Sequence, residues 1–233
     1  MKCTLYKFRP LSAFLLLLIL GCKSNSQELN KTVDKDINSN QVSWKSNIHE
    51  AMAEAKSRNE LLFVYCYSPT CSHCQAVSPF FDTAEIAVKY NSNFTSYRLN
   101  LLEETEIKFL EDHNLNLLNW PRLLFFDGDG NLVHEAGAEP NMASIIDAAE
   151  GALKPLERAE SYAKRFKAGE RSIEFLSKYA SFTKVTMDTT KGIEVAEALF
   201  NIYPKDKLGS QESWDLTKAC VSDIDNGFAQ YWL

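Results

Sequence analysis

Two cysteines three residues apart, Cys71 and Cys74, are the residues best suited to chemistry in this chain of 233 residues. They follow an apolar run, residues 61–67, at the point where helical periodicity begins. A cysteine at the first turn of a helix lies beside unpaired backbone N–H groups, which favour the thiolate. Because the thiolate attacks disulfides, this placement predicts thiol–disulfide exchange. We expect Cys71 to be the more exposed nucleophile and Cys74 the buried resolving thiol.

The neighbours of the pair bear on its reactivity. His73 can place positive charge beside the thiolate, which stabilises the reduced form and raises the oxidising power of the pair. Two other interpretations of the same spacing remain, a purely structural disulfide and half of a metal site.

The elements that must position the cysteines alternate along the chain. We expect helices at 47–58 (capped by Asn47), at 71–90 with a kink at Pro79, at 104–113 with Ile107 and Leu110 inward, and at 141–153. We expect strands at 61–67, 94–99, 122–126 and 132–136, the last two joined by a hairpin turn at 127–130. This order predicts an α/β fold whose sheet has a central parallel pair and an antiparallel edge.

Residues 42–153 resemble the thioredoxin superfamily in several motifs. Residues 67–74 are similar to the active-site turn of disulfide isomerase domains, and Pro79 matches the proline that kinks the following helix in thioredoxins. Trp120-Pro121 resembles the family's cis-proline loop, and Gly137 its glycine after the last strand. The resemblance implies a thioredoxin fold, a central mixed sheet flanked by helices, with a substrate groove beside Trp120 and Pro121.

Three positions depart from the family pattern. Ser72 replaces the more usual Gly or Pro, so the potential that Ser72 and His73 set is not inherited from any one relative. Tyr65 stands where many members carry a buried acid that deprotonates the resolving thiol. Trp120 is bulkier than the usual residue there, and it either lines a substrate groove or packs.

The first residues predict export. Three basic residues precede an apolar run at 11–20 that is too short to span a bilayer, and the run ends in Gly21-Cys22, which resembles a bacterial lipobox. We therefore expect a lipoprotein signal peptide at 1–21, a lipid on Cys22 and a polar tether at 22–41. The alternative is an ordinary secretory signal. The resulting location is a bacterial membrane surface, facing the periplasm or the cell exterior.

The charge of the chain argues against nucleic acid as a partner. The formal net charge is −6, and loss of the three basic residues with the signal makes it −9. An acidic protein lacks the basic surface that nucleic acid requires.

The remaining segment, residues 154–233, carries apolar stripes at helical spacing that begin near Leu156, Ile173, Ile193 and Trp214. We expect a helical extension of four helices. It resembles loosely the helical extensions of some bacterial thioredoxin-like lipoproteins, and its role cannot be inferred from the sequence.

Other residues are weaker candidates for chemistry. The spacing of Cys66, Cys71 and Cys74 is that of a plant-type ferredoxin cluster. The place of Cys66 in an expected strand favours a buried, inert thiol instead. The sequence gives Cys220 no role. Residues 127–131 begin like a calcium loop, yet Leu132 and Ala138 stand where Gly and Glu are needed. His49, His113 and His134 lack ligand spacing and are expected at the surface or its boundary. We predict no metal and no cofactor.

Taken together, these features predict a lipid-anchored, periplasm-facing thiol–disulfide oxidoreductase. Its partners would be the thiols or disulfides of exported proteins, or a redox partner protein. The direction of electron flow, oxidase or isomerase against reductase, stays open. The alternative is a redox-inert thioredoxin-fold scaffold whose helical extension binds a partner at the membrane.

Overall fold

The structure is a computed structural model that describes residues 39–117 and 119–233. The expected signal peptide, Cys22 and the first part of the expected tether lie outside these residues. In the described part of the chain, no helix has both the length and the apolar character needed to cross a membrane.

One five-stranded sheet has the order β1-β3-β2-β4-β5. Its strands are β1 (Trp44–Lys45), β2 (Leu61–Tyr67), β3 (Phe94–Asn100), β4 (Arg122–Phe126) and β5 (Leu132–Gly137). The pairs β1–β3 and β2–β3 are parallel, whereas β2–β4 and β4–β5 are antiparallel. The predicted central parallel pair and antiparallel edge are therefore confirmed, and the two-residue edge strand β1 was missed because it is too short to show a periodicity.

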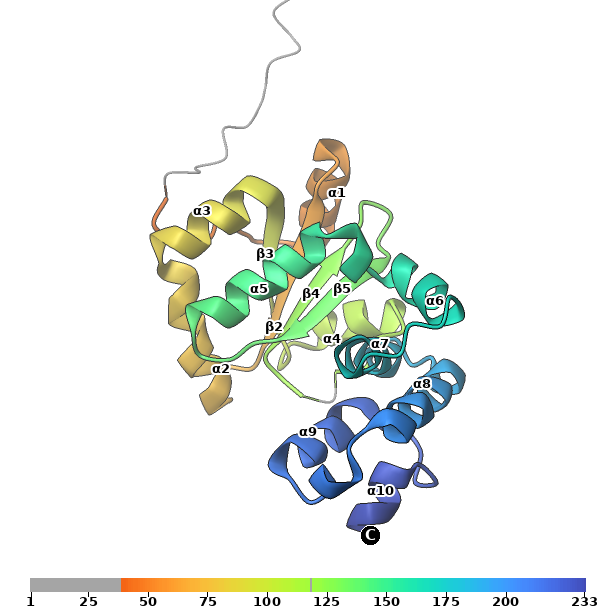
Figure 1. Cartoon of the computed structure of the whole chain (residues 1–233). Coiled ribbons are helices and arrows are strands. Elements are labelled where there is room, and N and C mark those ends of the chain that lie inside the picture. The colour runs from red at the N-terminus through yellow and green to blue at the C-terminus, as the bar shows by residue number, and fades with distance from the viewer. Residues whose placement is uncertain (1–38, 118) are drawn as a thin grey trace, which may run out of the picture. The chain divides into compact units, whose positions relative to one another are not determined.

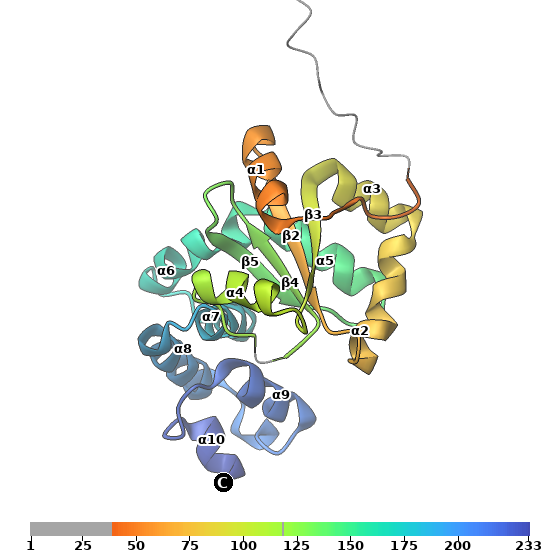
Figure 2. The same cartoon turned by 180° about the vertical axis from the view of Figure 1, so that it is seen from behind.

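Helices cover both faces of the sheet. The helices up to the end of the predicted fold are α1 (Ile48–Arg58), α2 (Ser72–Val77), α3 (Ala84–Asn93), α4 (Glu104–Asp112) and α5 (Met142–Leu153). Figure 1 shows α3 and α5 on the near face, and Figure 2, from behind, shows α1 and α4 on the other. This is the thioredoxin fold that the sequence predicted, with a mixed sheet between two helical layers.

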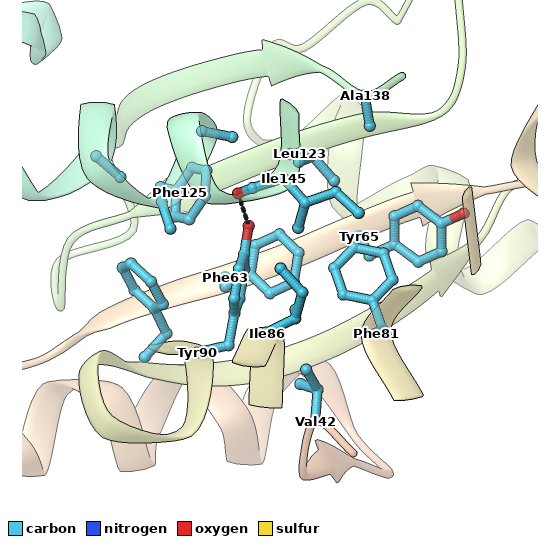
Figure 3. Close-up of a cluster of buried hydrophobic side chains, with 14 of the residues drawn as sticks. Val42, Phe63, Tyr65, Phe81, Ile86, Tyr90, Leu123, Phe125, Ala138 and Ile145 are labelled. Atoms are coloured by element: carbon cyan, nitrogen blue, oxygen red, sulfur yellow. Dashed lines mark hydrogen bonds between the residues drawn. The ribbon is translucent and has the colours of Figure 1, made fainter. Parts of the chain in front are cut away.

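An aromatic core fills the space between the sheet and the layer of α3 and α5. Figure 3 shows Phe63 of β2 at its centre, with Tyr65, Phe81 and Tyr90 around it. Phe63 and Tyr90 pack edge to face with ring centroids 4.6 Å apart. The Tyr90 hydroxyl donates to the Ile145 carbonyl at 2.8 Å, which ties α3 to α5. Strand β2 is buried on both faces, as its continuous apolar run predicts.

A second core lies on the opposite face and extends beyond the predicted fold. It joins α1, α4 and the other side of the sheet, and it includes Leu115 and also Val185, which belongs to the C-terminal helices. A third core is formed within those helices. The C-terminal segment therefore packs on the sheet-containing part through a shared apolar cluster.

The C-terminal segment is helical, as expected, but its helices differ in number and bounds from the prediction. They are α6 (Ala159–Lys167), α7 (Ile173–Val185), α8 (Thr189–Ile202), α9 (Gln211–Cys220) and α10 (Gly227–Trp232). The fourth expected helix, whose apolar stripe ran from Trp214 to Ile224, ends instead at Cys220, and Ile224 is exposed after it. The short helix α10 was not predicted. Leu156 is also exposed, in a 3₁₀ turn (Pro155–Glu157) before α6. In Figures 1 and 2, α8, α9 and α10 lie beyond α7, on its side away from the sheet.

Three further predictions were wrong in detail. The single kinked helix at 71–90 is instead α2, a 3₁₀ segment (Ser78–Asp82) and α3, because Pro79 lacks the N–H that would continue the α-helix. In α4, Leu110 faces inward but Ile107 is exposed, and Phe109 is buried in its place. His134 is buried rather than at the surface, where its Nδ1 lies 3.0 Å from the Glu157 carbonyl oxygen.

Candidate active site

The two cysteines are positioned by a tight turn between β2 and α2. Pro69 occupies the second position of a β-turn in which Cys71 N–H donates to the Ser68 carbonyl at 3.1 Å, and proline is favoured there because its φ is fixed. The Ser68 hydroxyl forms a hydrogen bond with Thr70 Oγ1 at 2.9 Å, which links two residues of the turn. Cys71 is then the residue that caps α2. The chain is therefore turned so that both sulfurs lie at the start of the helix.

The two thiols differ in environment as the sequence predicts. Cys71 is partly exposed, and its Sγ accepts the Cys74 backbone N–H at 3.1 Å. Cys74 is buried, with 1% of its surface exposed. Burial, and next the hydrogen bond with Cys71, raise the pKa of the Cys74 thiol to about 11. Both thiols are free, so the structure is that of the dithiol form.

Trp120 and Pro121 meet the first cysteine across the site. The peptide bond between them is cis, as the resemblance implied. The Trp120 carbonyl oxygen lies 3.9 Å from Cys71 Sγ. Pro121 is buried, whereas 45% of the Trp120 side chain is exposed. The structure thus brings the candidate nucleophile and the candidate substrate-binding residues together, with an exposed indole at the rim.

The two residues between the cysteines have different surroundings. Ser72 is exposed at the start of α2. His73 is held, because its Nε2–H donates to the Ala138 carbonyl at 2.9 Å, and the Glu139 carboxylate lies 3.8 Å away. Ala138 directly follows β5, so this contact joins the cysteine loop to the end of the edge strand.

The position of the missing buried acid is occupied by a hydrogen-bonded tyrosine. The Tyr65 hydroxyl lies 3.1 Å from both the Cys74 carbonyl oxygen and Ser78 Oγ. Burial raises the pKa of Tyr65 to about 12, so the phenol is protonated near neutral pH and cannot act as a base there. Tyr65 instead fixes the backbone of the resolving cysteine.

A cavity of about 390 Å³ opens beside Cys74. Ser78, Asp82 and Arg98 line it, and one Arg98 Nη atom lies 3.9 Å from the Asp82 carboxylate. Sequence reasoning missed these residues, because Arg98 lies on a different strand and nothing in its local pattern connects it to the cysteines. Cys74 belongs to the lining of this cavity as well.

The remaining cysteines lie apart from the pair. Cys66 is fully buried in β2, and burial raises its pKa well above the ordinary thiol value. Cys220 is buried in α9, where its thiol donates to the Ser177 carbonyl at 3.5 Å and burial raises its pKa to about 12. Within residues 39–117 and 119–233, no group of three or more His, Cys, Asp or Glu side chains is arranged to hold a metal ion.

Comparison with known proteins gives one family. Residues 43–128 match the model of a family described as thioredoxin-like. No curated protein matches the sequence. A candidate disulphide-isomerase from Bacteroides thetaiotaomicron has 18% identity and a TM-score of 0.42 over 50% of this chain and 96% of its own. The disulphide isomerase from Xylella fastidiosa Temecula1 has 10% identity and a TM-score of 0.39 over 49% and 98%. The DsbH oxidoreductase has 14% identity and a TM-score of 0.42 over 51% and 88%. The segment that matches the family model contains both cysteines and the cis peptide bond.

Proposed function

Residues 43–128 form a thioredoxin-like domain, which places this part of the chain in the thioredoxin superfamily, and on that premise we propose that the protein is a thiol–disulfide oxidoreductase. The reaction uses Cys71 as the nucleophile and Cys74 as the resolving thiol. One observation carries the proposal. The exposed Cys71 sulfur caps a helix, accepts a backbone N–H and faces the carbonyl oxygen that precedes Pro121.

The geometry supports a two-step exchange. Cys71 Sγ attacks a substrate disulfide, and a mixed disulfide forms while the other substrate sulfur leaves as a thiolate. Cys74 then loses its proton into the cavity beside it and attacks Cys71 Sγ. The second substrate sulfur leaves, so the substrate has gained two electrons and the pair has become a disulfide. The same steps in reverse transfer a disulfide to the substrate.

Trapping the mixed disulfide tests this proposal. With Cys74 replaced by Ser, the first step proceeds and the second cannot. We predict that the Cys74→Ser variant, incubated with disulfide-bonded insulin, accumulates an adduct that dithiothreitol releases and that mass spectrometry assigns to Cys71. The Cys66→Ala/Cys74→Ser variant is the matched control and forms the same adduct. If Cys71→Ser/Cys74→Ser forms as much adduct, Cys71 is not the nucleophile, and the redox-inert scaffold takes the place of this proposal.

We propose further that the protein is exported and held at a bacterial membrane by lipid on Cys22, so that it meets exported proteins or a redox partner. The basic residues, short apolar run and Gly21-Cys22 junction at the N-terminus support this. In a bacterial host, the intact chain is expected in the membrane fraction. Cys22→Ala is expected to leave that fraction or to remain as an uncleaved precursor. Equal lipid labelling of both forms would contradict a lipid on Cys22.

A further inference from the structure

A groove of about 690 Å³ runs along the outer edge of β5, and we call it the β5 groove. Glu135, Ala136 and Gly137 form its floor, α5 borders it on one face of the sheet, and α7 and α9 border it on the other. In the sheet, β5 has β4 as its one neighbour. The C-terminal segment packs on part of β5 through α6 and Glu157, and it leaves a channel beside Glu135, Ala136 and Gly137 at the other end of the strand.

The β5 groove begins where the candidate active site ends. Gly137 pairs with Arg122, and Arg122 directly follows Pro121. The next residue after Gly137, Ala138, accepts the hydrogen bond of His73. A polypeptide whose cysteine reaches Cys71 therefore has its neighbouring residues at the mouth of this groove.

The chemistry of the floor suits an extended chain. The outer edge of an edge strand presents backbone N–H and C=O groups, which pair with an added strand. Gly137 is exposed and Ala136 is partly exposed, so this edge is accessible at the end nearest the cysteines. The Glu135 carboxylate is buried and forms an ion pair with Arg122, whose Nη2 lies 2.7 Å from Glu135 Oε2. Within the described chain, Glu135 Oε2 accepts no hydrogen bond.

The charge of the lining favours a cationic occupant. Five acidic and three basic side chains line the groove. All three bases are engaged within the lining, Arg122 with Glu135, Lys178 with Glu157 and Glu174, and Lys154 with Glu157. Glu150 pairs with Lys89 of α3, which lies outside the lining. Asp147 of α5 is exposed and forms no hydrogen bond or ion pair with the described residues. The excess negative charge therefore attracts basic side chains of a partner.

We propose that the β5 groove binds an extended, positively charged segment of a substrate protein, which adds to the edge of β5 next to the cysteine that reacts with Cys71. The assignment of the occupant as a redox substrate rests on the proposed function. The groove therefore selects substrates by two features, a backbone free to form strand hydrogen bonds and basic flanking residues.

Peptides of defined charge test this inference. Each peptide carries one cysteine, held as a mixed disulfide with the chromogenic thiol 5-thio-2-nitrobenzoate. The reduced protein is oxidised to the Cys71–Cys74 disulfide, and each peptide disulfide is reduced to two thiols. The second-order rate is divided by the rate of the same peptide with a free small dithiol. One peptide has lysines around the cysteine, one has glutamates, and one is the lysine peptide with alternate residues changed to proline, which lacks the N–H.

The protein variants are Asp147→Lys in the groove and, as the matched control, Glu197→Lys, which reverses an exposed acid on α8. We expect the lysine peptide to react about tenfold faster than the glutamate peptide. Asp147→Lys reduces that advantage about threefold, and Glu197→Lys leaves it unchanged. The proline peptide loses at least about fivefold against the lysine peptide, because strand hydrogen bonds are lost.

Other outcomes would overturn the inference in distinguishable ways. If all peptides react at equal normalised rates, the β5 groove selects nothing while the proposed function stands. If the proline peptide reacts like the lysine peptide, strand addition to β5 is wrong. If no peptide reacts, the proposed function fails, and binding of the fluorescent lysine peptide with Ser in place of its cysteine decides about the groove. Binding weakened by Asp147→Lys alone then supports it, and no binding overturns it.

Discussion

At the scale of single residues, the central feature is the contrast between two thiols, of which Cys71 accepts a hydrogen bond from the Cys74 backbone N–H. Cys71 is partly exposed, and Cys74 is buried beneath it. The tyrosine behind Cys74 holds its backbone but cannot take its proton at neutral pH. The pair therefore combines an accessible sulfur with a buried sulfur that Tyr65 cannot deprotonate near neutral pH.

This contrast predicts a pH profile for alkylation. Burial, then the hydrogen bond with Cys71, raise the pKa of Cys74 to about 11. With Cys66 and Cys220 replaced by Ala, we expect iodoacetamide to modify Cys71 at neutral pH and Cys74 only as the pH approaches 11. Mass spectrometry after each pulse counts the adducts. In urea, both thiols should react alike near the ordinary thiol pKa, and equal reaction of both in the folded protein would contradict the contrast.

The same shift has a consequence for stability. The folded state holds the Cys74 proton more tightly than the unfolded chain, whose thiol has its ordinary pKa of about 9. The stabilisation that the protonated Cys74 thiol gives the folded state is complete below about pH 9, and it is lost as the pH rises toward 11.

At the scale of elements, α7 holds both ends of the segment that carries the cis peptide bond. The Asn116 backbone N–H donates to the Val185 carbonyl at 2.9 Å, ahead of that bond. Behind it, Arg122 donates to Ser181 Oγ at 3.0 Å, and Ser181 donates to Glu135 at 2.8 Å. The C-terminal helices are thus part of the scaffold that positions Trp120 and Pro121.

Replacement of Ser181 measures this attachment. We expect Ser181→Ala to lower the free energy of unfolding in urea by about 1–3 kcal/mol, because it leaves a buried ion pair with a bond missing on each side. Ser177→Ala is the matched control on the same helix. Among the described residues, its hydroxyl bonds only the Ile173 carbonyl one turn back, so its cost should stay within about 0.5 kcal/mol. Equal losses of unfolding free energy in the two variants would show that the hydrogen bonds of Ser181 to Arg122 and Glu135 do not hold α7 to the sheet.

The sequence predicted several elements of the sheet-containing part well, since each carries a strong local signal. The apolar run at 61–67, the Asn47 cap and the turn at 127–130 are all present as expected. Contacts between distant segments could not be predicted. Arg98 at the cavity beside Cys74 and Ser181 on α7 come near the site only through the fold, and neither has a local pattern. His134 was misplaced because its burial depends on the contact with Glu157.

At the scale of the whole molecule, the described residues, 39–117 and 119–233, belong to one compact unit. The helices after α5 have their own apolar core, yet Val185 belongs to the core on the sheet. The domain boundary near residue 153 that the sequence predicts stays a prediction. Unfolding experiments can test whether the parts on either side of it are stable independently.

We expect the two parts to unfold together. The chain has four tryptophans, of which Trp44 packs on the sheet and Trp214 and Trp232 contact each other in the C-terminal helices. One variant keeps Trp44 as its sole tryptophan, and another keeps only Trp214 and Trp232. Their fluorescence transitions in urea should coincide with each other and with the loss of helical circular dichroism. Separate midpoints would instead identify residues 154–233 as an independently folding domain.

The reduction potential of the Cys71–Cys74 pair tests the central claim most directly. It is measured in glutathione buffers of graded ratio, with Cys66 and Cys220 replaced by Ala. We predict one reversible two-electron transition between dithiol and disulfide. A midpoint near about −120 to −180 mV would identify a donor of disulfides or an isomerase, and one near about −270 mV a reductase. If no disulfide forms between Cys71 and Cys74 at any ratio, the protein is not an oxidoreductase of this kind.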